Sequence, residues 1–372
     1  MLVTPRDGLH YQEFLYRDVE ASGVRVRYTK GPTPSHTLNI LLAPAVLMWY
    51  RARGFRVLHI HWVFQFSLPW AGQKQWARRV MEWWFGLYLR TARVLGYGIV
   101  WTAHDLLPHE QVFANDRRAR DLLLSKTEVV IALSEATATE LREMGARRVS
   151  VIPMGSYADP YPVILTTDQA RASFGFDDDA VVVALIGRIE PYKGADLLLA
   201  AAAQLPTSSR IKILLAGLCS DEDYRNELIR LAGETGGRAT TIFEWIPDAD
   251  LARFLQATDV AAFPFREITN SASVLLAQSF GRPVIIPDLP SLRDIPSDAA
   301  VRFEPGLETL VSALERAEQL SESEYGVMST AGLAWATRVD WANIARETVE
   351  TYEIASLGKK KISTESEESR VS

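Results

Sequence analysis

The stretch "VVVALIGRIEPYKGADLLLAAAAQL", residues 181–205, shows the fold class most directly. An apolar run of aliphatic residues ends at Gly187, and a helical pattern begins just after Gly194. Similar apolar runs alternate with helical patterns along the chain, and this alternation is typical of parallel sheets covered by helices on both faces. The sequence therefore predicts an α/β protein.

The number of these runs and the length of the chain together predict two domains. Predicted strands lie at 56–62, 97–104, 127–134 and 148–154 in the first half, and at 180–187, 211–217, 240–245, 259–265 and 282–288 in the second. A chain of 372 residues exceeds what one hydrophobic core usually supports. The boundary is expected within "PMGSYADPYPV" (153–163), where proline, glycine and small polar residues interrupt the pattern.

These signals divide the chain into segments with different expected structures. Residues 1–156 should form an N-terminal domain and residues 157–339 a C-terminal domain. The helical pattern at 340–356 is expected to pack back on the first domain. The tail 357–372 has almost no apolar content and is expected to be disordered.

Composition excludes several classes of protein. A net charge of −6 argues against a nucleic-acid binder, which usually carries a basic domain. The single cysteine, Cys219, excludes an internal disulfide and a cysteine-based metal site, and fits a reducing compartment. The longest apolar run, at 40–50, is too short for a membrane span, and the N-terminus lacks a secretory signal pattern. We expect a cytoplasmic protein.

Two cations follow the strand that ends at Gly187. Ligands of open α/β sheets bind beyond the carboxyl ends of the strands, so Arg188 and Lys193 are placed where chemistry is expected. Two cations in one loop suit a diphosphate, which needs both charge and hydrogen-bond donors. The plainer alternative is a solvated basic turn.

A second polar loop, "REITNSAS" (266–273), follows the predicted strand 259–265. A helix is expected to begin near Ser271 or Ser273, because both are good capping residues. The free N–H groups at a helix start attract anions, so Asn270, Ser271, Ala272 and Ser273 form a second candidate anion site. Two such loops on one sheet indicate a nucleotide diphosphate.

The second half also resembles a known family. The motifs "GR-x4-KG", "IPDADLARFLQATDVAAFPF", "AQSFGRPVI" and "DWANIARETVETYE" occur in order over most of residues 180–355 and resemble the C-terminal domain of family 4 glycosyltransferases with the GT-B fold. The resemblance implies two facing Rossmann-like domains with a cleft between them. It also implies a nucleotide-sugar donor held by Gly187, Arg188, Lys193 and the amides near 271–273, with no cofactor and no metal.

One departure from the family pattern affects the expected chemistry. The family typically carries two glutamates eight residues apart, and here the two positions hold Ile268 and Leu276, with Glu267 one place away. Glu267 is a candidate substitute donor ligand. The serine-rich loop is closer to bacterial β-mannosyltransferase-like enzymes that act on glycolipid intermediates. A GDP-mannose or UDP-sugar donor and an inverting reaction are therefore expected.

Histidines in the first half supply the candidate catalytic groups. His59 and His61 lie in "LHIHW", and His104 and Asp105 lie in "WTAHDLLPHE". The spacing of "HDLLPH" does not match common zinc sites. The resemblance places "HD" toward the sugar and acceptor, where His104 or Asp105 would serve as general base, with His59, His61 and Gly8 on the acceptor side. The alternative is that the histidines and the aspartate are purely structural.

A basic aromatic segment, "GQKQWARRVMEWWFGLYLRTARVLG" (72–96), interleaves arginines with tryptophans. Such a helix suits peripheral contact with an anionic membrane. It is equally consistent with a half-buried helix whose arginines provide solubility. The sequence as a whole predicts a glycosyltransferase with a lipid-linked or polysaccharide acceptor; the alternatives are a nucleotide-sugar epimerase on the same fold and a degenerate scaffold or binding subunit.

Overall fold

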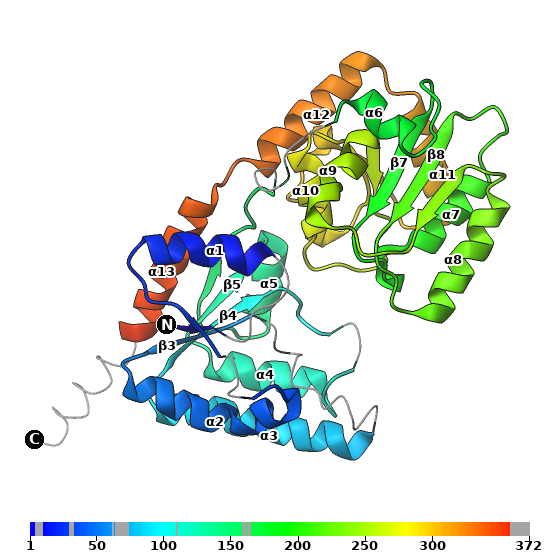
Figure 1. Ribbon diagram of the computed structural model, residues 1–372. Coiled ribbons are helices and arrows are strands. Elements are labelled where there is room, and N and C mark those ends of the chain that lie inside the picture. Colours follow the sequence, from blue (N-terminus) through cyan, green and yellow to red (C-terminus); the bar gives the residue numbers. More distant parts are fainter. Residues whose placement is uncertain are drawn as a thin grey trace, which may run out of the picture. The chain divides into compact units, whose positions relative to one another are not determined.

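The computed structural model describes residues 1–3, 10–29, 33–61, 63, 74–108, 111–157, 161 and 165–357 (Figure 1). The chain divides into two compact units. The first unit is Met1–Met154 together with Asp340–Ser372, and the second unit is Gly155–Val339. Each has its own sheet and its own hydrophobic core.

The first unit is built on a six-stranded parallel sheet in the order β2-β1-β3-β4-β5-β6. Its strands are β1 (Leu2–Val3), β2 (Arg27–Tyr28), β3 (Val57–Ile60), β4 (Gly98–Ala103), β5 (Val129–Ala132) and β6 (Val149–Val151). The four strands predicted in this half are confirmed as β3 to β6. The sequence did not predict β1 and β2, because two-residue strands are too short to produce a period-2 pattern.

Helices cover both faces of this sheet. They are α1 (His10–Ala21), α2 (His36–Ala52), α3 (Gln75–Val94), α4 (Asp116–Lys126), α5 (Glu135–Glu143) and α13 (Trp341–Leu357). Helices α1 and α13 pack against each other on one face, and α2, α3 and α4 lie on the other (Figure 1). None of the described helices, α2 with its apolar run included, is long and apolar enough to cross a membrane.

Helix α13 joins the first unit although it comes from the far end of the chain. It contacts α1 and strands β3, β4 and β5. Its buried residues recur at helical spacing and form one stripe: Trp341, Ile344, Ala345, Thr348, Thr351, Tyr352 and Ala355. A Cβ on Gly98 would lie 2.3 Å from the carbonyl oxygen of Ala355, so only glycine allows the helix to come this close to the start of β4.

The second unit repeats the architecture with the strand order β12-β11-β10-β7-β8-β9, again all parallel. The strands are β7 (Val181–Ile186), β8 (Ile211–Ala216), β9 (Ala239–Ile242), β10 (Val260–Ala262), β11 (Val284–Pro287) and β12 (Ala300–Phe303). Alternate residues of β7 point into different hydrophobic clusters. Val183 and Leu185 belong to the cluster on one face of the sheet, and Val182 and Ala184 belong to the cluster on the other face. Both faces of the sheet are therefore covered, as the continuous apolar run predicts.

The helices of the second unit are α6 (Thr167–Ala172), α7 (Ala195–Ala203), α8 (Glu222–Glu234), α9 (Asp248–Ala257), α10 (Ala272–Ser279), α11 (Leu307–Glu318) and α12 (Glu322–Ala336). Short 3₁₀ turns are η3 (Pro191–Lys193), η4 (Pro290–Leu292) and η5 (Ser297–Ala299). Strand β7 pairs with β8 on one side and with β10 on the other. The order of strands reverses at this point, which is where open α/β sheets bind ligands.

Candidate active site

The loops after β7 and β10 meet at the switch point of the second sheet. Gly187 ends β7 with a φ of 115°, and a Cβ there would lie 3.5 Å from the Ser273 hydroxyl oxygen and 3.6 Å from the Lys193 amine. Three of the predicted donor-binding residues are thus brought together from two separate loops. The missing side chain at Gly187 keeps the space beside Lys193 and Ser273 open.

Lys193 is the buried cation of this loop pair. Its side chain is only 7% exposed, and its Nζ donates a hydrogen bond of 3.3 Å to Ser273 Oγ. Burial lowers the pKa of Lys193 to about 8, while the Glu190 carboxylate partly opposes that shift. A protonated amine held in this way is costly without an anion, so the site favours a negatively charged ligand.

Arg188 differs from Lys193 in its surroundings. Its side chain is exposed, and it forms an ion pair of 3.6 Å with Glu190. Such a pair is weak because water screens it. Arg188 therefore lies at the rim of the loop and Lys193 at its base.

Helix α10 begins at the residue pair predicted from the sequence. Ser271 is its N-cap and accepts a hydrogen bond of 3.1 Å from Val274 N. Ala272 is exposed, and Asn270 and Ser273 are half-buried. The first turn of α10 therefore presents N–H groups beside Lys193, and its positive dipole end adds to the field of the amine.

Close backbone contacts brace the two loops. Gly194, in the left-handed region at a φ of 72°, would place a Cβ 2.1 Å from the Pro264 carbonyl oxygen. Arg266 N donates to the Tyr192 carbonyl at 2.9 Å, and its guanidinium pairs with Asp196, which also accepts from Tyr224 at 2.7 Å. The turn that carries Lys193 is therefore tied to the loop that precedes α10.

The two positions where the family pattern has glutamates hold apolar side chains that pack inward. Leu276 packs against the cluster that contains Phe254 and Leu255, and Ile268 packs against the core on the other face. Glu267 is exposed on the loop. The nearest carboxylate in the sequence thus lies at the surface and outside the buried part of the site.

The first unit holds a buried hydrogen-bonded chain at the carboxyl ends of β3 and β4. His61 Nδ1 and His104 Nε2 are 3.0 Å apart, and His61 Nε2 is hydrogen-bonded to the hydroxyl of Tyr16. The chain continues through His59, whose Nδ1 lies 2.8 Å from the hydroxyls of both Tyr16 and Tyr352. It ends at Thr102, whose hydroxyl oxygen is 2.8 Å from His59 Nε2.

These histidines are held in the neutral form. Burial lowers the pKa of His59 and of His104 to about 3, and the pKa of His61 is lowered well below its usual value by burial and by its two histidine neighbours. Burial also raises the pKa of Tyr16. The chain is therefore a network of neutral donors and acceptors near pH 7.

Asp105 and His104 end β4 but differ in exposure. His104 is 8% exposed and lies edge-on to the ring of Tyr11, with centroids 4.8 Å apart. Asp105 is half-buried. Of the two predicted catalytic residues, Asp105 is the more exposed, and His104 belongs to the buried chain.

The two described residues predicted on the acceptor side, His59 and His61, are both buried. His59 is fully buried and His61 is 2% exposed, and both ring nitrogens of each are engaged in the chain described above. Their place on the acceptor side stays a prediction, and their burial means that they would act on an acceptor only through other groups. Gly8 lies outside the described residues.

The same histidines bear on whether the first unit could hold a metal ion. Within the part of the chain that the structure describes, no group of three His, Cys, Asp or Glu side chains is placed to hold a metal ion. His109 and Glu110 lie outside that part.

Sequence reasoning did not identify Tyr16, Thr102 or Tyr352. Tyr352 contacts His59 across 293 positions of the chain. A tyrosine within a helical pattern looks like ordinary core, so no local signal distinguishes it. The bracing pair of Asp196 and Arg266 was missed for the same reason, since 70 residues separate its members.

Two family models match the chain, one in each half. Residues 1–156 match "Glycosyltransferase Family 4", and residues 166–327 match "Glycosyl transferases group 1". Each half of the chain is thus similar to a glycosyltransferase domain.

Curated relatives are between 26% and 33% identical to this chain over the aligned regions. A D-inositol 3-phosphate glycosyltransferase of Segniliparus rotundus is 27% identical over 291 residues, which is 71% of this chain and 62% of the relative. One of Mycolicibacterium gilvum is 33% identical over 180 residues, 46% of this chain and 40% of the relative. The chain thus spans less than two thirds of the length of these relatives. They are not β-mannosyltransferases, so the narrower resemblance stated above has no support from them.

Solved structures show the same architecture. A sucrose-phosphate synthase from Thermosynechococcus elongatus superimposes with a TM-score of 0.73 at 19% identity, covering 95% of this chain and 97% of the other. HepE of Anabaena, solved in complex with UDP and glucose, gives a TM-score of 0.70 at 18% identity, covering 95% and 98%. At these identities the likeness concerns the fold, and it confirms the α/β architecture of the GT-B type.

Proposed function

We propose that this chain is a glycosyltransferase that moves a sugar from a nucleotide diphosphate donor to a hydroxyl group of an acceptor. The observation that carries the proposal is the buried Lys193 amine beside Ser273 and the first turn of α10, in a domain that matches a glycosyltransferase model. Relatives named as glycosyltransferases and a structural neighbour solved with UDP support the same function.

In the proposed reaction the second unit binds the leaving group. Lys193 and the amide groups of the first α10 turn bind the diphosphate, and Arg188 adds charge at the rim. As the bond from the sugar to the diphosphate breaks, negative charge grows on the departing phosphate oxygen. Preorganised cations and N–H donors stabilise that charge more in the transition state than in the ground state, which lowers the barrier.

The first unit supplies the base in this proposal. Asp105 accepts the proton of the acceptor hydroxyl while the oxygen forms a bond to the anomeric carbon of the donor sugar. Its half-buried position supports this role better than that of His104, which is only 8% exposed and has Nε2 hydrogen-bonded to His61. His104 then acts through its bond to His61 as a positioning residue.

The proposed stereochemistry is inversion, with a β-linked product from an α-linked donor. It rests on Leu276, which packs into an apolar cluster where the family pattern has a glutamate, and on a base in the other unit. The anomeric configuration of the product, measured by NMR, tests this point alone. An α-linked product would contradict inversion without affecting the proposed transferase activity.

The donor is proposed to be a UDP-sugar or GDP-mannose, and the acceptor a lipid-linked or polysaccharide intermediate. A thermal-shift screen against UDP, GDP and their sugars tests the donor, because a ligand at about 100 times its Kd stabilises the folded state by about 2.7 kcal/mol. Acceptors to be tested include D-inositol 3-phosphate, the compound named in the relatives. We expect a shift with one nucleotide family and transfer to one acceptor class.

The same screen separates the alternatives. Conversion of the free nucleotide sugar to an epimer without acceptor would indicate an epimerase. If the nucleotide sugar binds but is not hydrolysed, transferred or epimerised, the chain would be a scaffold or binding subunit. The apolar Leu276, at a position where the family pattern has a glutamate, favours that alternative. If no nucleotide or nucleotide sugar shifts the unfolding temperature, the donor site proposed here is wrong.

Peripheral contact with an anionic membrane is proposed for the outward face of α3. Trp76 and Trp83 are 52% and 62% exposed, Val80 lies between them, and Arg79 and Arg90 are exposed on the same helix. This arrangement suits a helix lying at an interface. Sedimentation with anionic vesicles should fall as salt rises, because salt screens surface charge. Equal binding to neutral and anionic vesicles would contradict the electrostatic contribution.

A further inference from the structure

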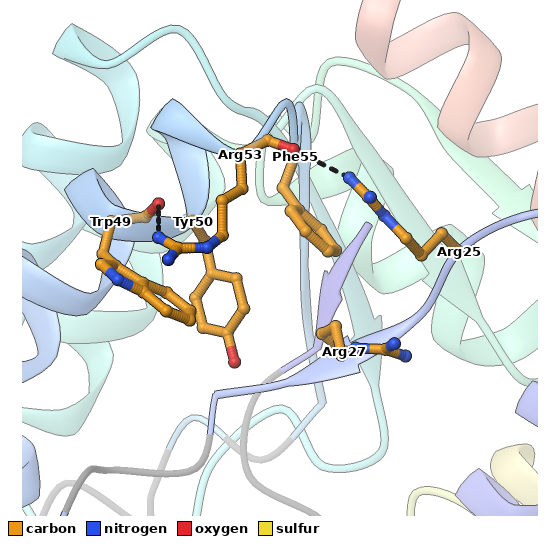
Figure 2. A pocket seen from close by; sticks show the side chains of 6 residues that line it. All are labelled: Arg25, Arg27, Trp49, Tyr50, Arg53 and Phe55. Atoms are coloured by element: carbon orange, nitrogen blue, oxygen red, sulfur yellow. Dashed lines mark hydrogen bonds between the residues drawn. The ribbon is translucent and has the colours of Figure 1, made fainter.

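A hollow of about 350 Å³ lies in the first unit, far from the groups assigned to catalysis (Figure 2). Its lining residues come from β2, from the segment just before it, and from the end of α2 and the turn that follows: Arg25, Arg27, Trp49, Tyr50, Arg53 and Phe55. Three of the six are arginines and the other three are aromatic. The hollow is therefore both cationic and apolar.

The hollow lies at the opposite end of the sheet from His104. Arg25 comes just before β2 and Phe55 just before β3, at the amino ends of parallel strands, whereas His61 and His104 follow the carboxyl ends of β3 and β4. A four-residue strand is about 13 Å long. A ligand in the hollow is thus separated from the proposed reaction by the length of the sheet, and it would anchor the protein without reacting.

The arginines have few protein acceptors. Arg25 donates a hydrogen bond of 2.8 Å to the carbonyl of Arg53, and Arg53 donates one of 3.4 Å to the carbonyl of Trp49. Each guanidinium carries five N–H donors, so most remain without an acceptor among the described residues. Arg27 has one carboxylate partner, Glu20, at 4.0 Å with both side chains more than half exposed. Carboxylates therefore do not neutralise the hollow.

Aromatic rings hold two of these guanidinium groups in place. Arg25 lies over Phe55 at 4.3 Å from the ring centroid, and Arg53 lies over Trp49 at 3.4 Å. Figure 2 shows Phe55 between these two arginines. A stacked guanidinium loses less rotamer freedom when it binds an anion, and its planar fork matches the oxygens of a phosphate.

The hollow continues into an apolar surface on α2. Leu38, Leu41, Met48 and Trp49 are all exposed, and they recur at helical spacing along one side of the helix. Trp49 belongs both to this stripe and to the wall of the hollow. Helix α2 contains no aspartate or glutamate, and it packs against α3, whose outward face carries the exposed tryptophans.

We propose that this hollow binds the phosphate group of an anionic phospholipid while the exposed side of α2 contacts the acyl region. Charge complementarity favours this occupant: uncompensated guanidinium groups suit the phosphate, and the adjoining apolar stripe suits the lipid beneath it. The inference rests on the membrane contact proposed above and specifies its headgroup site. It does not depend on the identity of the sugar donor.

The experiment compares two double variants that remove the same charge. Arg25→Gln with Arg53→Gln empties the hollow of two arginines, and Arg142→Gln with Arg346→Gln removes two exposed arginines from α5 and α13. Binding is measured by sedimentation with vesicles of phosphatidylcholine alone and of phosphatidylcholine with phosphatidylglycerol. Each arginine near an anionic surface strengthens binding by about fivefold. We therefore expect the first variant to bind the anionic vesicles more than tenfold more weakly than the unaltered protein. The affinity of the second variant should change by less than about twofold.

A third variant and a soluble probe complete the test. Arg27→Gln removes an exposed lining arginine that does not lie over an aromatic ring, so it tests the site if the double variant fails to fold. It should weaken vesicle binding by about fivefold. Inorganic phosphate, titrated by calorimetry, distinguishes a free phosphate site from a lipid site.

The outcomes separate this inference from the proposals on which it rests. Equal losses in the two double variants would overturn the site, because diffuse charge would then explain the binding. Phosphate binding that needs Arg25 and Arg53, with vesicle binding that does not, would overturn the lipid as occupant. If the unaltered protein does not sediment with anionic vesicles, both the proposed membrane contact and this headgroup site are wrong. The nucleotide-sugar screen judges the transferase function separately.

Discussion

At the carboxyl edge of the first sheet, His61 is hydrogen-bonded to both Tyr16 and His104. At the same edge of the second sheet, Lys193 is hydrogen-bonded to one hydroxyl among the described residues, that of Ser273. The first arrangement is a network of neutral groups. The second keeps a buried positive charge that has no carboxylate in contact among the described residues. This difference supports the proposal that the first edge holds a catalytic group in a fixed geometry and that the second edge binds an anion.

The largest expected effect tests the catalytic half of this comparison. Asp105→Asn should lower kcat by about 10²–10⁴-fold, the usual contribution of a general base, and should leave donor affinity unchanged. Asp121→Asn, on the exposed side of α4, serves as the control and should have full activity. Full turnover in both Asp105→Asn and His104→Ala would place the base elsewhere.

The next effect tests the anion-binding half. Lys193→Ala should weaken binding of the nucleotide diphosphate by about 10- to 150-fold, which corresponds to about 1.5–3 kcal/mol for a charged hydrogen bond. Lys212→Ala, at the amino end of β8, is a matched control that removes the same charge from the same unit. Calorimetry with UDP and GDP measures both variants, and equal affinities in the two would remove Lys193 from the site.

The hydrogen-bonded histidine chain of the first unit should contribute to the stability of that unit. Tyr16→Phe removes one buried hydrogen-bond partner from His59 and one from His61, so we expect a loss of about 1–3 kcal/mol in the free energy of unfolding of that unit. Tyr50→Phe is the control, because its hydroxyl makes only a 3.5 Å contact with the Tyr28 carbonyl. Denaturant unfolding of both variants decides the point; a similar small loss in each would mean that the network is not strongly coupled.

The pH dependence of donor binding follows from the lowered pKa of Lys193. With a pKa of about 8 the amine carries its proton below that pH and loses it above, so affinity should be constant below pH 8 and fall as pH rises. The decline approaches tenfold per pH unit, about 1.4 kcal/mol, if only the charged form binds. Lys193→Arg should abolish the decline between pH 7 and 10. An unchanged slope in that variant would assign the titration to another group.

The smallest effect separates the two cations of the loop. Arg188→Ala should weaken donor binding by less than about fivefold, since an exposed, partly paired charge contributes about 1 kcal/mol or less. Titration of UDP into Arg188→Ala and Lys193→Ala under the same salt gives the comparison directly. If the arginine variant loses more affinity than the lysine variant, the rim of the loop matters more than its base.

Local patterns predicted the α/β architecture, although they missed the described strands β1, β2 and β12. The apolar runs identified nine strands, because a strand buried on both faces must be apolar along its length. The donor loops could be found because Gly187 and Ser271 are local signals of a strand end and a helix cap. The positions of Lys193 and Arg188 in the sequence did not reveal which of them is buried.

The sequence by itself determined the alternation of strands and helices, the order of the glycosyltransferase motifs and the place of the loops that follow the strands, since each depends on neighbouring residues and on backbone periodicity. Only the tertiary structure decided that His59 bonds to Tyr352, that Leu276 turns into an apolar cluster and that Arg25 and Arg53 share one hollow. These contacts join residues far apart in the chain. Their partners are set by how helices pack on the sheet, and no periodic pattern records that packing.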